Sequence, residues 1–405
     1  MNDTAAAAGG GREPLGEAFD LLAAYPGHGG FLIDRGGRGV VAGAGGPSGT
    51  DVGPAGLRRL SRWALDRLQT RPEAVAVGIV PFDPAVHATI RVPDVAIRRT
   101  EGRAELLAAP GASPPVLSRA PQRPAEAFTE LQLRPVPPPD GYASAVRVAI
   151  DRIGSGDLSK VVLARSVRVE AGRALDPRAL VARLRAVDPG SYAFAVPTGP
   201  ASSLVGATPE LLLRRRGGVV ESRPLAGSAP RGGDRDSDRA HAQALLESAK
   251  DREEHRLVVD AIAEVLGAMC EELTWDPEPV LHETANVWHL ATGFRGVLRE
   301  PAPTALQIVA ELHPTPAVGG TPREDALALI RELESSDRGA YAGAIGWIDA
   351  RGDGEWAIAL RCAELEGERA TLYAGAGIVM GSLPERELDE TERKFRAFLD
   401  ALRWG

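Results

Sequence analysis

The sequence predicts an α+β fold in which antiparallel β-sheets pack together and helices lie outside them. Two runs of short apolar strands joined by turns predict antiparallel pairing, one over residues 192–224 and one over residues 342–379. A long helical pattern lies between the two runs, over residues 247–266. Strands that follow one another directly, without a helix after each, favour α+β over a parallel α/β sheet.

The composition divides the chain into three parts. Residues 1–14, "MNDTAAAAGGGREP", contain no apolar segment after a basic start, so we expect a disordered N-terminus without a secretion signal. Residues 15–140 are expected to form an N-terminal subdomain that ends in a proline-rich segment and carries no chemical motif. Residues 141–405 are expected to form one large catalytic region.

Local signals predict the first elements in order. Residues 54–69 have the apolar spacing of a helix, and "AVAVGIVPF" at 74–82 is typical of a buried strand. A second helix over residues 141–153 ends at "GSG", and the strand "SKVVLARS" follows at 159–166. The next helix, within 176–190, begins at an Asp-Pro pair and ends at a glycine.

Charge and composition exclude several classes of function. The formal net charge of −8 and the 5% aromatic content give no footprint for nucleic acid or for an anionic membrane. No segment approaches the roughly 18 apolar residues that a membrane-spanning helix needs. Cys270 and Cys362 both lie in apolar stretches, which indicates buried, reduced thiols and a cytoplasmic protein.

Lysine is rare in this chain, and its positions are therefore informative. Of 47 basic residues, only Lys160, Lys250 and Lys394 are lysines. Arginine holds a surface charge equally well but cannot release its proton, whereas a desolvated lysine can become a neutral base. Lys160 in "SKVVLARS" is thus a candidate general base. The alternative is a charged residue that protects the edge of a sheet.

Two carboxylates border the apolar face of the helix at 247–266. Glu254 falls on that face and Asp251 lies one turn before it, whereas Glu253 points away. Neighbouring carboxylates on a buried face need a cation or a proton. The alternatives are therefore a metal ion and an arginine partner.

The last helix, within residues 383–402, repeats this arrangement. Glu387, Glu390 and Lys394 run along the edge of its apolar stripe. A solvated face with a Glu390–Lys394 pair explains this spacing without any function. If the two helices meet, one or two carboxylates from each would suit Mg²⁺, which keeps water ligands and binds substrate oxygens.

Three further segments carry weaker signals. Glu210 follows a proline in "GATPELLLRR" and is a candidate general acid, the alternative being an exposed glutamate at a strand start. The glycine-rich run at 373–382 offers backbone N–H groups to an anion but is more typical of a turn. His289 lies in an apolar strand, where a core histidine is the common outcome.

Taken together, these segments resemble the chorismate-utilising enzymes, and most closely the isochorismate synthases of siderophore pathways. The matching segments, in consistent order over residues 145–400, are "SKVVLARS", "GATPELLLRR", "RPLAGSAPRG", "AKDREEHRLVVDAI", "VWHLAT", "LHPTPAVGGTP", "YAGAIGWIDARGDGEWAIALRCAE", "LYAGAGIV" and "ERELDETERKF". The N-terminal 140 residues carry little of the resemblance. It implies a single large α+β domain with a cleft for chorismate and Mg²⁺.

The resemblance also implies a role for each candidate residue. Lys160 matches the base that activates water for attack at ring carbon 2, and Glu210 matches the acid that protonates the departing 4-hydroxyl. The implied metal ligands, with the two supporting residues last, are Glu254, Glu390, Asp251 and Glu387. The implied substrate-binding residues are Gly227, Ser228, His289, Ala317, Tyr341, Arg361, Gly375 and Lys394. One departure is Gly319, where relatives often carry cysteine or serine.

Other functions remain as alternatives. A salicylate synthase of the same family would go on to eliminate pyruvate, but the small side chain of Ala317 favours stopping at isochorismate. Lys160 and the absence of a glutaminase segment argue against the ammonia-using members, so no glutaminase subunit is expected. From a different class, a non-catalytic, metal-dependent chorismate-binding protein would not need an acid–base pair. We expect a monomer that binds neither nucleic acid nor a membrane.

Overall fold

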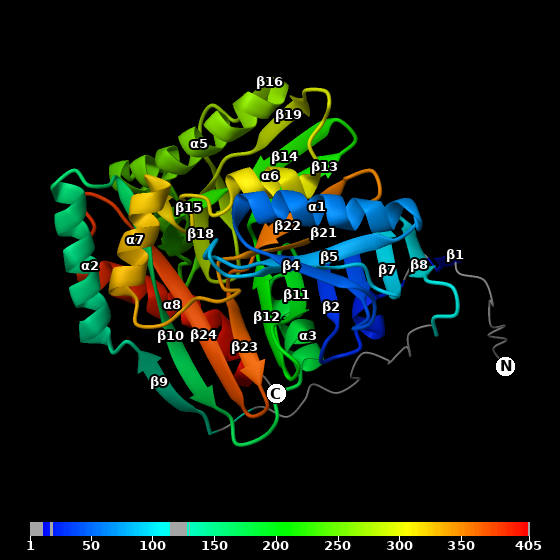
Figure 1. The fold of residues 1–405 in the computed structure, drawn as a ribbon. Coiled ribbons are helices and arrows are strands. Elements are labelled where there is room, and N and C mark those ends of the chain that lie inside the picture. The colour runs from blue at the N-terminus through cyan, green and yellow to red at the C-terminus, as the bar shows by residue number, and fades with distance from the viewer. Residues whose placement is uncertain (1–10, 17–18, 114–127, 129, 404–405) are drawn as a thin grey trace.

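The computed structural model describes residues 11–16, 19–113, 128 and 130–403, and it confirms the predicted α+β class. Within these residues the strands form three antiparallel sheets, and the helices lie around them (Figure 1). None of the helices of this part of the chain is both long and apolar enough to cross a membrane.

The largest sheet of the described residues joins strands from both ends of the chain. Its order is β1 (Gly11–Leu15), β8 (Arg103–Ala108), β7 (Val95–Thr100), β3 (Arg38–Ala42), β2 (Phe31–Arg35), β11 (Tyr192–Pro197), β12 (Ser202–Thr208), β23 (Cys362–Glu366), β24 (Arg369–Ile378), β10 (Lys160–Glu170) and β20 (Gly320–Thr321), with β9 (Gln132–Val136) also paired to β10. Strand β2 pairs directly with β11. Residues 15–140 therefore continue the sheet of the following region and do not form a sheet of their own.

The second sheet mixes the two regions in the same way. Its order is β16 (Cys270–Trp275), β19 (Phe294–Leu298), β14 (Val219–Arg223), β13 (Leu211–Arg216), β22 (Gly354–Ile358), β21 (Ala344–Asp349), β5 (Val75–Val80), β6 (Ala88–Arg91) and β4 (Ser48–Asp51). A small third sheet has the order β15 (Leu225–Pro230), β18 (Val287–Ala291) and β17 (Val280–Glu283).

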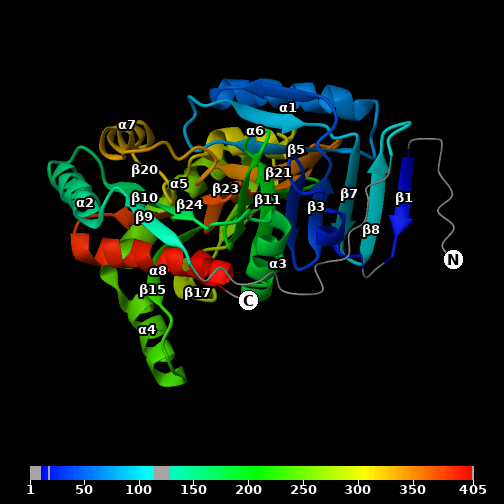
Figure 2. The ribbon, with the colours of Figure 1, turned by 90° about the horizontal axis from the view of Figure 1, so that it is seen from below.

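The helices cover the outer surfaces of these sheets. They are η1 (Leu21–Ala24), α1 (Gly53–Gln69), α2 (Pro139–Gly154), α3 (Pro177–Val187), α4 (Arg235–Glu247), α5 (Ala249–Met269), α6 (Ala305–Leu312), α7 (Arg323–Leu333) and α8 (Pro384–Arg403). Figure 2 shows α1 and α6 on one side of the molecule, α8 on the other, and α4 projecting outward. The sequence did not predict α4, α6 or α7. Helix α6 has only eight residues, which is too short for its period to be recognised against that of a buried strand.

The large sheet is buried on both faces, which explains why its central strands are continuously apolar. In β11, Phe194 and Val196 belong to the core between the two large sheets. Their neighbours Ala193 and Ala195 belong to the core under α3 and α8. Alternate residues of a strand point to opposite faces, so both faces of this sheet need apolar residues.

One expectation about the N-terminal segment needs correction. The N-terminus was expected to be disordered through residue 14, but residues 11–15 form β1 and pair with β8 over five positions. Residues 1–10 lie outside the described residues. In the proline-rich segment, residues 114–127 and 129 also lie outside them, while β9 pairs with β10. Both cysteines are free and buried, as predicted.

Candidate active site

Two segments cross side by side between the large sheet and the second sheet. Glu210 lies where the chain passes from β12 to β13, and Arg361 lies where it passes from β22 to β23. The Ile358 N–H donates to the Glu210 carbonyl at 3.2 Å, and the Ala207 N–H donates to the Arg361 carbonyl at 3.3 Å. These bonds hold the two crossings together at the seam between the sheets.

A cavity at this seam brings most of the predicted site residues together. Those that line it are Glu210, Gly227, Ser228, Glu254, His289, Ala317, Tyr341, Arg361, Gly375, Glu390 and Lys394. Lys160, Asp251 and Glu387 do not line this cavity, but each contacts or neighbours a residue of the Glu254–Glu390 region. The site thus draws residues from four strands, β10, β15, β18 and β24, from helices α5 and α8, and from connecting loops, although most are far apart in the sequence.

Lys160 is the first residue of β10 and is fully buried. Its Cα partner is Thr321 of β20 on one side, and the next residue along pairs with β24 on the other. A lysine that protects a sheet edge must face water, so burial excludes that alternative. Its Nζ lies 3.1 Å from Oε1 of Glu254, yet it has no partner with hydrogen-bond geometry among the described residues. A buried polar atom without a protein partner is commonly explained by a bound water, an ion or a functional role.

Glu210 is also buried, which excludes an exposed glutamate at a strand start. Burial raises the pKa of its carboxyl from 4.5 to about 8, although the nearby charge of Lys160 lowers it in part. The side chain is therefore mostly protonated near neutral pH and can donate a proton. A buried amine and a buried acid thus lie within electrostatic reach of each other.

Helices α5 and α8 meet at the same place, which was the condition for a metal site. Lys250 of α5 places its Nζ 3.2 Å from Oε1 of Glu387 on α8. The same Nζ lies 3.8 Å from both Asp251 and Glu254. As the helix periodicity predicted, Glu254 is buried whereas the Glu253 side chain is 53% exposed. The cations in contact with Glu254 are lysines, not the arginine of the alternative explanation.

The carboxylates of this cluster carry more negative charge than their lysines compensate. Burial and the charge of Glu390 raise the pKa of Glu387 to about 7. Burial also opposes ionisation of Glu390, but Lys394 and Lys250 outweigh it and lower its pKa. A divalent cation would relieve the repulsion between these two groups.

The carboxylates at this place suit a metal ion that is bound by protein and substrate together. Among the described residues, no three acidic, imidazole or thiol side chains converge as a complete metal cluster. Mg²⁺, however, is commonly bound by one or two carboxylates together with water and substrate oxygens. Glu254 and Glu390 both line the cavity, one from each helix, so the residues present fit this mode of binding.

The cationic side of the cavity contains Arg361 and Lys394. Lys394 Nζ donates to the Gly375 carbonyl and to Oε1 of Glu390, both at 2.7 Å. The Arg361 guanidinium donates to Nε2 of His289 at 2.5 Å. Burial lowers the pKa of Arg361 to about 10, which still leaves it charged at neutral pH. Residues 373–378 of the glycine-rich run, including Gly375, belong to strand β24, and the turn that such a run typically forms follows at residues 380–381.

Several residues of the site carried no recognisable signal in the sequence. Arg338 lines the cavity and donates to the carbonyls of Val162 and Val318, each at 2.7 Å. It thereby ties β10 to the loop that contains Ala317. Tyr373 stacks on Tyr341 with ring centroids 5.0 Å apart. Nothing distinguishes one arginine in an arginine-rich chain until the fold places it.

Comparison with known proteins gives a consistent family assignment. The model of the family described as chorismate binding enzyme matches residues 111–403. Isochorismate synthase DhbC from Bacillus subtilis is 40% identical over 347 residues, which cover 84% of this chain and 83% of that protein. Isochorismate synthase EntC from Escherichia coli is 38% identical over 328 residues, which cover 80% of each chain.

A solved structure shows the same fold. MenF, the menaquinone-specific isochorismate synthase from Escherichia coli, superposes with a TM-score of 0.82 at 26% identity. The match covers 97% of this chain and 95% of that one. The resemblance identified from the motifs is thus confirmed: the chain belongs to the chorismate binding enzyme family.

Proposed function

We propose that this protein is an isochorismate synthase, which converts chorismate to isochorismate with the help of Mg²⁺. The observation that carries the proposal is the proximity of two buried groups. The Glu210 carboxyl, whose pKa is raised, lines the cavity, and the Lys160 amine lies 3.1 Å from Glu254, which also lines it. A protein that only binds chorismate has no need of such a pair. The similarity to DhbC and EntC supports the same reaction.

The chemistry requires a base and an acid because neither hydroxide nor a hydroxide leaving group is available near neutral pH. The Lys160 amine takes a proton from water as the water oxygen bonds to ring carbon 2. Both ring double bonds shift by one position, and the bond from carbon 4 to its hydroxyl breaks. Glu210 donates its proton to that hydroxyl, which leaves as water. Transfer of a proton from Lys160 back to Glu210 restores the enzyme.

Chorismate is a dianion, and a chain of net charge −8 can hold it only where cations are concentrated. Arg361 would bind the enolpyruvyl carboxylate, and Lys394 would lie near the ring carboxylate. Glu254 and Glu390 would hold Mg²⁺, with Asp251 and Glu387 supporting it through water. When bound, the metal neutralises the charge of the ring carboxylate.

The proposal includes the setting of the reaction. We infer a cytoplasmic monomer that acts without a glutaminase subunit and supplies a siderophore pathway. The resemblance of the motifs to siderophore-type isochorismate synthases supports the inferred pathway. A lysine base that activates water supports the inference that no ammonia donor is needed.

Product analysis tests the proposal. Purified protein is incubated with chorismate and Mg²⁺, and products are followed by proton NMR, with Glu210→Gln as the matched inactive control. We expect isochorismate without stoichiometric pyruvate. Pyruvate released at the rate of chorismate loss, together with salicylate, would instead identify a salicylate synthase. Saturable chorismate binding without turnover would identify a non-catalytic binding protein.

A further inference from the structure

Arg361 is a half-buried cation whose direct partners are neutral groups. Its Nη1 donates to Oγ1 of Thr284 at 2.9 Å, and its Nη2 donates to Nε2 of His289 at 2.5 Å. These two bonds use two of the five N–H groups of the guanidinium, and neither partner carries a negative charge. The nearby charge of Asp188 acts on Arg361 only at longer range. A cation held in this way can still form a strong pair with an anionic ligand.

The hydrogen bonds of His289 fix its role as an acceptor. Its Nδ1 lies 3.2 Å from the Gly227 carbonyl, which can only accept, so Nδ1 carries the hydrogen. Burial and the charge of Arg361 lower the pKa of His289 well below its ordinary value, so the ring is neutral. Nε2 then has a free lone pair, and it points at Arg361.

Thr284 is oriented just as firmly. The residue is buried, and its hydroxyl donates to the Val287 carbonyl at 2.7 Å. Because the hydroxyl hydrogen is used in that bond, Oγ1 can act only as an acceptor for its other partners, which are Arg361 at 2.9 Å and the Val287 N–H at 3.4 Å. The turn between β17 and β18 thus supplies one acceptor, and β18 itself supplies the other.

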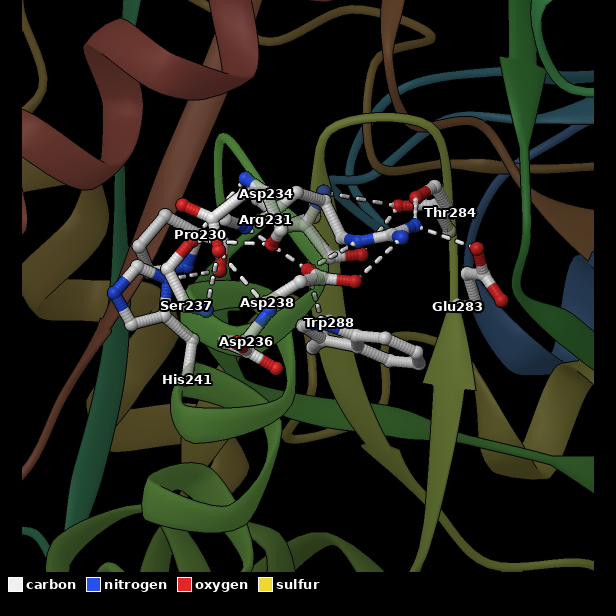
Figure 3. A network of polar contacts seen from close by, with 12 residues as sticks. Pro230, Arg231, Asp234, Asp236, Ser237, Asp238, His241, Glu283, Thr284 and Trp288 are labelled. Carbon is white, nitrogen blue, oxygen red and sulfur yellow. Dashed lines mark hydrogen bonds and ion pairs between the residues drawn. The ribbon is translucent and has the colours of Figure 1, made fainter.

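A cluster of polar contacts outside the cavity holds Thr284 in place (Figure 3). Arg231 donates to the Thr284 carbonyl at 3.0 Å and to Glu283 at 2.7 Å. It also donates to both oxygens of Asp238 on α4, each at 2.7 Å. The indole N–H of Trp288 donates to the same carboxylate at 2.9 Å, and the Arg231 guanidinium lies 4.6 Å from the Trp288 ring centroid. These contacts therefore join helix α4 to the third sheet next to Thr284.

The orientation of the Arg361 side chain depends on these hydrogen bonds, because its backbone has an unusual conformation. Its φ is +49°, in the left-handed region that residues with a Cβ rarely adopt. The chain is turning there from the second sheet into the large one. An arginine side chain has many rotamers, and loss of one acceptor would let the guanidinium leave the cavity wall.

We propose that Thr284 is a positioning residue for Arg361, which it holds with the remaining N–H groups free for a substrate carboxylate, and that the Arg231–Asp238 pair keeps Thr284 in place. The inference rests on the proposed function in one respect, because it takes chorismate to be the ligand that carries the carboxylate. It concerns a residue outside the cavity lining that neither the sequence motifs nor the resemblance pointed to.

Steady-state kinetics and binding with two matched variants test the proposal. Thr284→Val removes the acceptor and keeps the shape, whereas Thr284→Ser keeps the acceptor. Loss of a charged hydrogen bond should raise KM for chorismate by about 10- to 100-fold in Thr284→Val. We expect kcat to change much less, and Thr284→Ser to stay close to wild type. Titration calorimetry with chorismate in a Glu210→Gln background checks that the change is in binding.

A double-mutant cycle separates positioning from a general structural effect. In an Arg361→Met background, Thr284→Val should weaken binding little further, because the group that it positions is gone. Equal losses in both backgrounds would overturn the inference. So would wild-type affinity in Thr284→Val, provided that the wild type binds chorismate. A wild type that binds no chorismate would overturn the proposed function and this inference with it.

A more remote variant covers the case in which Thr284→Val does not fold. Asp238→Asn weakens the Arg231 pair and should raise KM a few-fold. Glu283→Gln is its control, because the Glu283 side chain is 62% exposed and its loss should have little effect. The same KM for both variants would contradict the proposed role of the Arg231–Asp238 pair.

Discussion

Lys160 Nζ lies 3.1 Å from Oε1 of Glu254, so the proposed base and a proposed metal ligand share one buried ion pair. Their side chains are 0% and 9% exposed. Removing two charges from water is costly, and breaking such a pair leaves an uncompensated charge in the interior. A ligand that binds Glu254, such as Mg²⁺, would therefore also change the surroundings of the Lys160 amine.

Replacement of Lys160 should abolish most of the activity. Lys160→Arg keeps the charge but cannot deprotonate, and Lys160→Met keeps most of the apolar stem. General-base catalysis is typically worth about 10²- to 10⁴-fold, so we expect both variants to lose about 10²-fold or more in kcat. Chorismate binding should survive in Lys160→Met. A near wild-type rate for Lys160→Arg would show that Lys160 is not the base.

The two acidic helices should both be needed for Mg²⁺. Glu254→Gln and Glu390→Gln should each weaken Mg²⁺ binding, measured by titration calorimetry, and remove turnover at ordinary Mg²⁺ concentrations. Glu253→Gln is the matched control, because it is the neighbour of Glu254 and its side chain is 53% exposed. Intact Mg²⁺ binding in Glu254→Gln beside its loss in Glu253→Gln would refute the metal assignment.

The raised pKa of Glu210 should limit activity at alkaline pH. An acid must be protonated to donate, so kcat/KM should fall as the pH rises through about 8. The pH profile of the wild type between pH about 6 and about 10 measures this directly. A profile that stays level through that range would exclude Glu210 as the general acid.

The same group should affect folding stability in a defined direction. The folded state binds the Glu210 proton more tightly than the unfolded state, because its pKa is raised from 4.5 to about 8. Its stabilising contribution is therefore complete below pH 4.5 and is lost as the pH rises through about 8. Without metal or chorismate, Glu210→Gln should gain in Tm relative to wild type over this interval. A Tm difference that does not change with pH would contradict the buried, protonated state.

Gly377 should be intolerant of a side chain for a local reason. A Cβ there would lie 2.0 Å from Oε1 of Glu254 and 3.2 Å from Cε of Lys160. Gly377→Ala should therefore displace the Glu254 carboxylate and lower kcat by at least about 10-fold without unfolding the protein. Gly267→Ala is the control, since nothing lies within 4 Å of its Cβ position. It should leave kcat unchanged and add about 0.5–1 kcal/mol to the free energy of unfolding.

Helix periodicity and residue chemistry predicted part of this site correctly. The burial of Glu254 and the exposure of Glu253 follow from 100° per residue along one helix, a purely local rule. The rarity of lysine drew attention to Lys160, which is buried beside Glu254, and its catalytic role stays a prediction. By contrast, the contact between Lys250 and Glu387 depends on the packing of α5 against α8, which no local pattern encodes.

Long-range contacts set the limit of the prediction. Thr284 and Arg361 are 77 residues apart, and their hydrogen bond exists only because the third sheet lies beside the crossing from β22 to β23. The sharing of both large sheets by the N-terminal strands was missed for the same reason. A proline-rich segment suggested a boundary near residue 140, but strand pairing between β2 and β11 crosses it.

The central claim is that water from the solvent attacks ring carbon 2 while the 4-hydroxyl departs. The most direct test is the reaction of chorismate and Mg²⁺ in ¹⁸O-labelled water, with early products analysed by mass spectrometry and by ¹³C NMR isotope shifts. The account predicts isochorismate that carries one ¹⁸O atom, bonded to carbon 2. Isochorismate formed without ¹⁸O would mean that the hydroxyl migrates within the substrate, which would contradict the acid–base mechanism of Lys160 and Glu210.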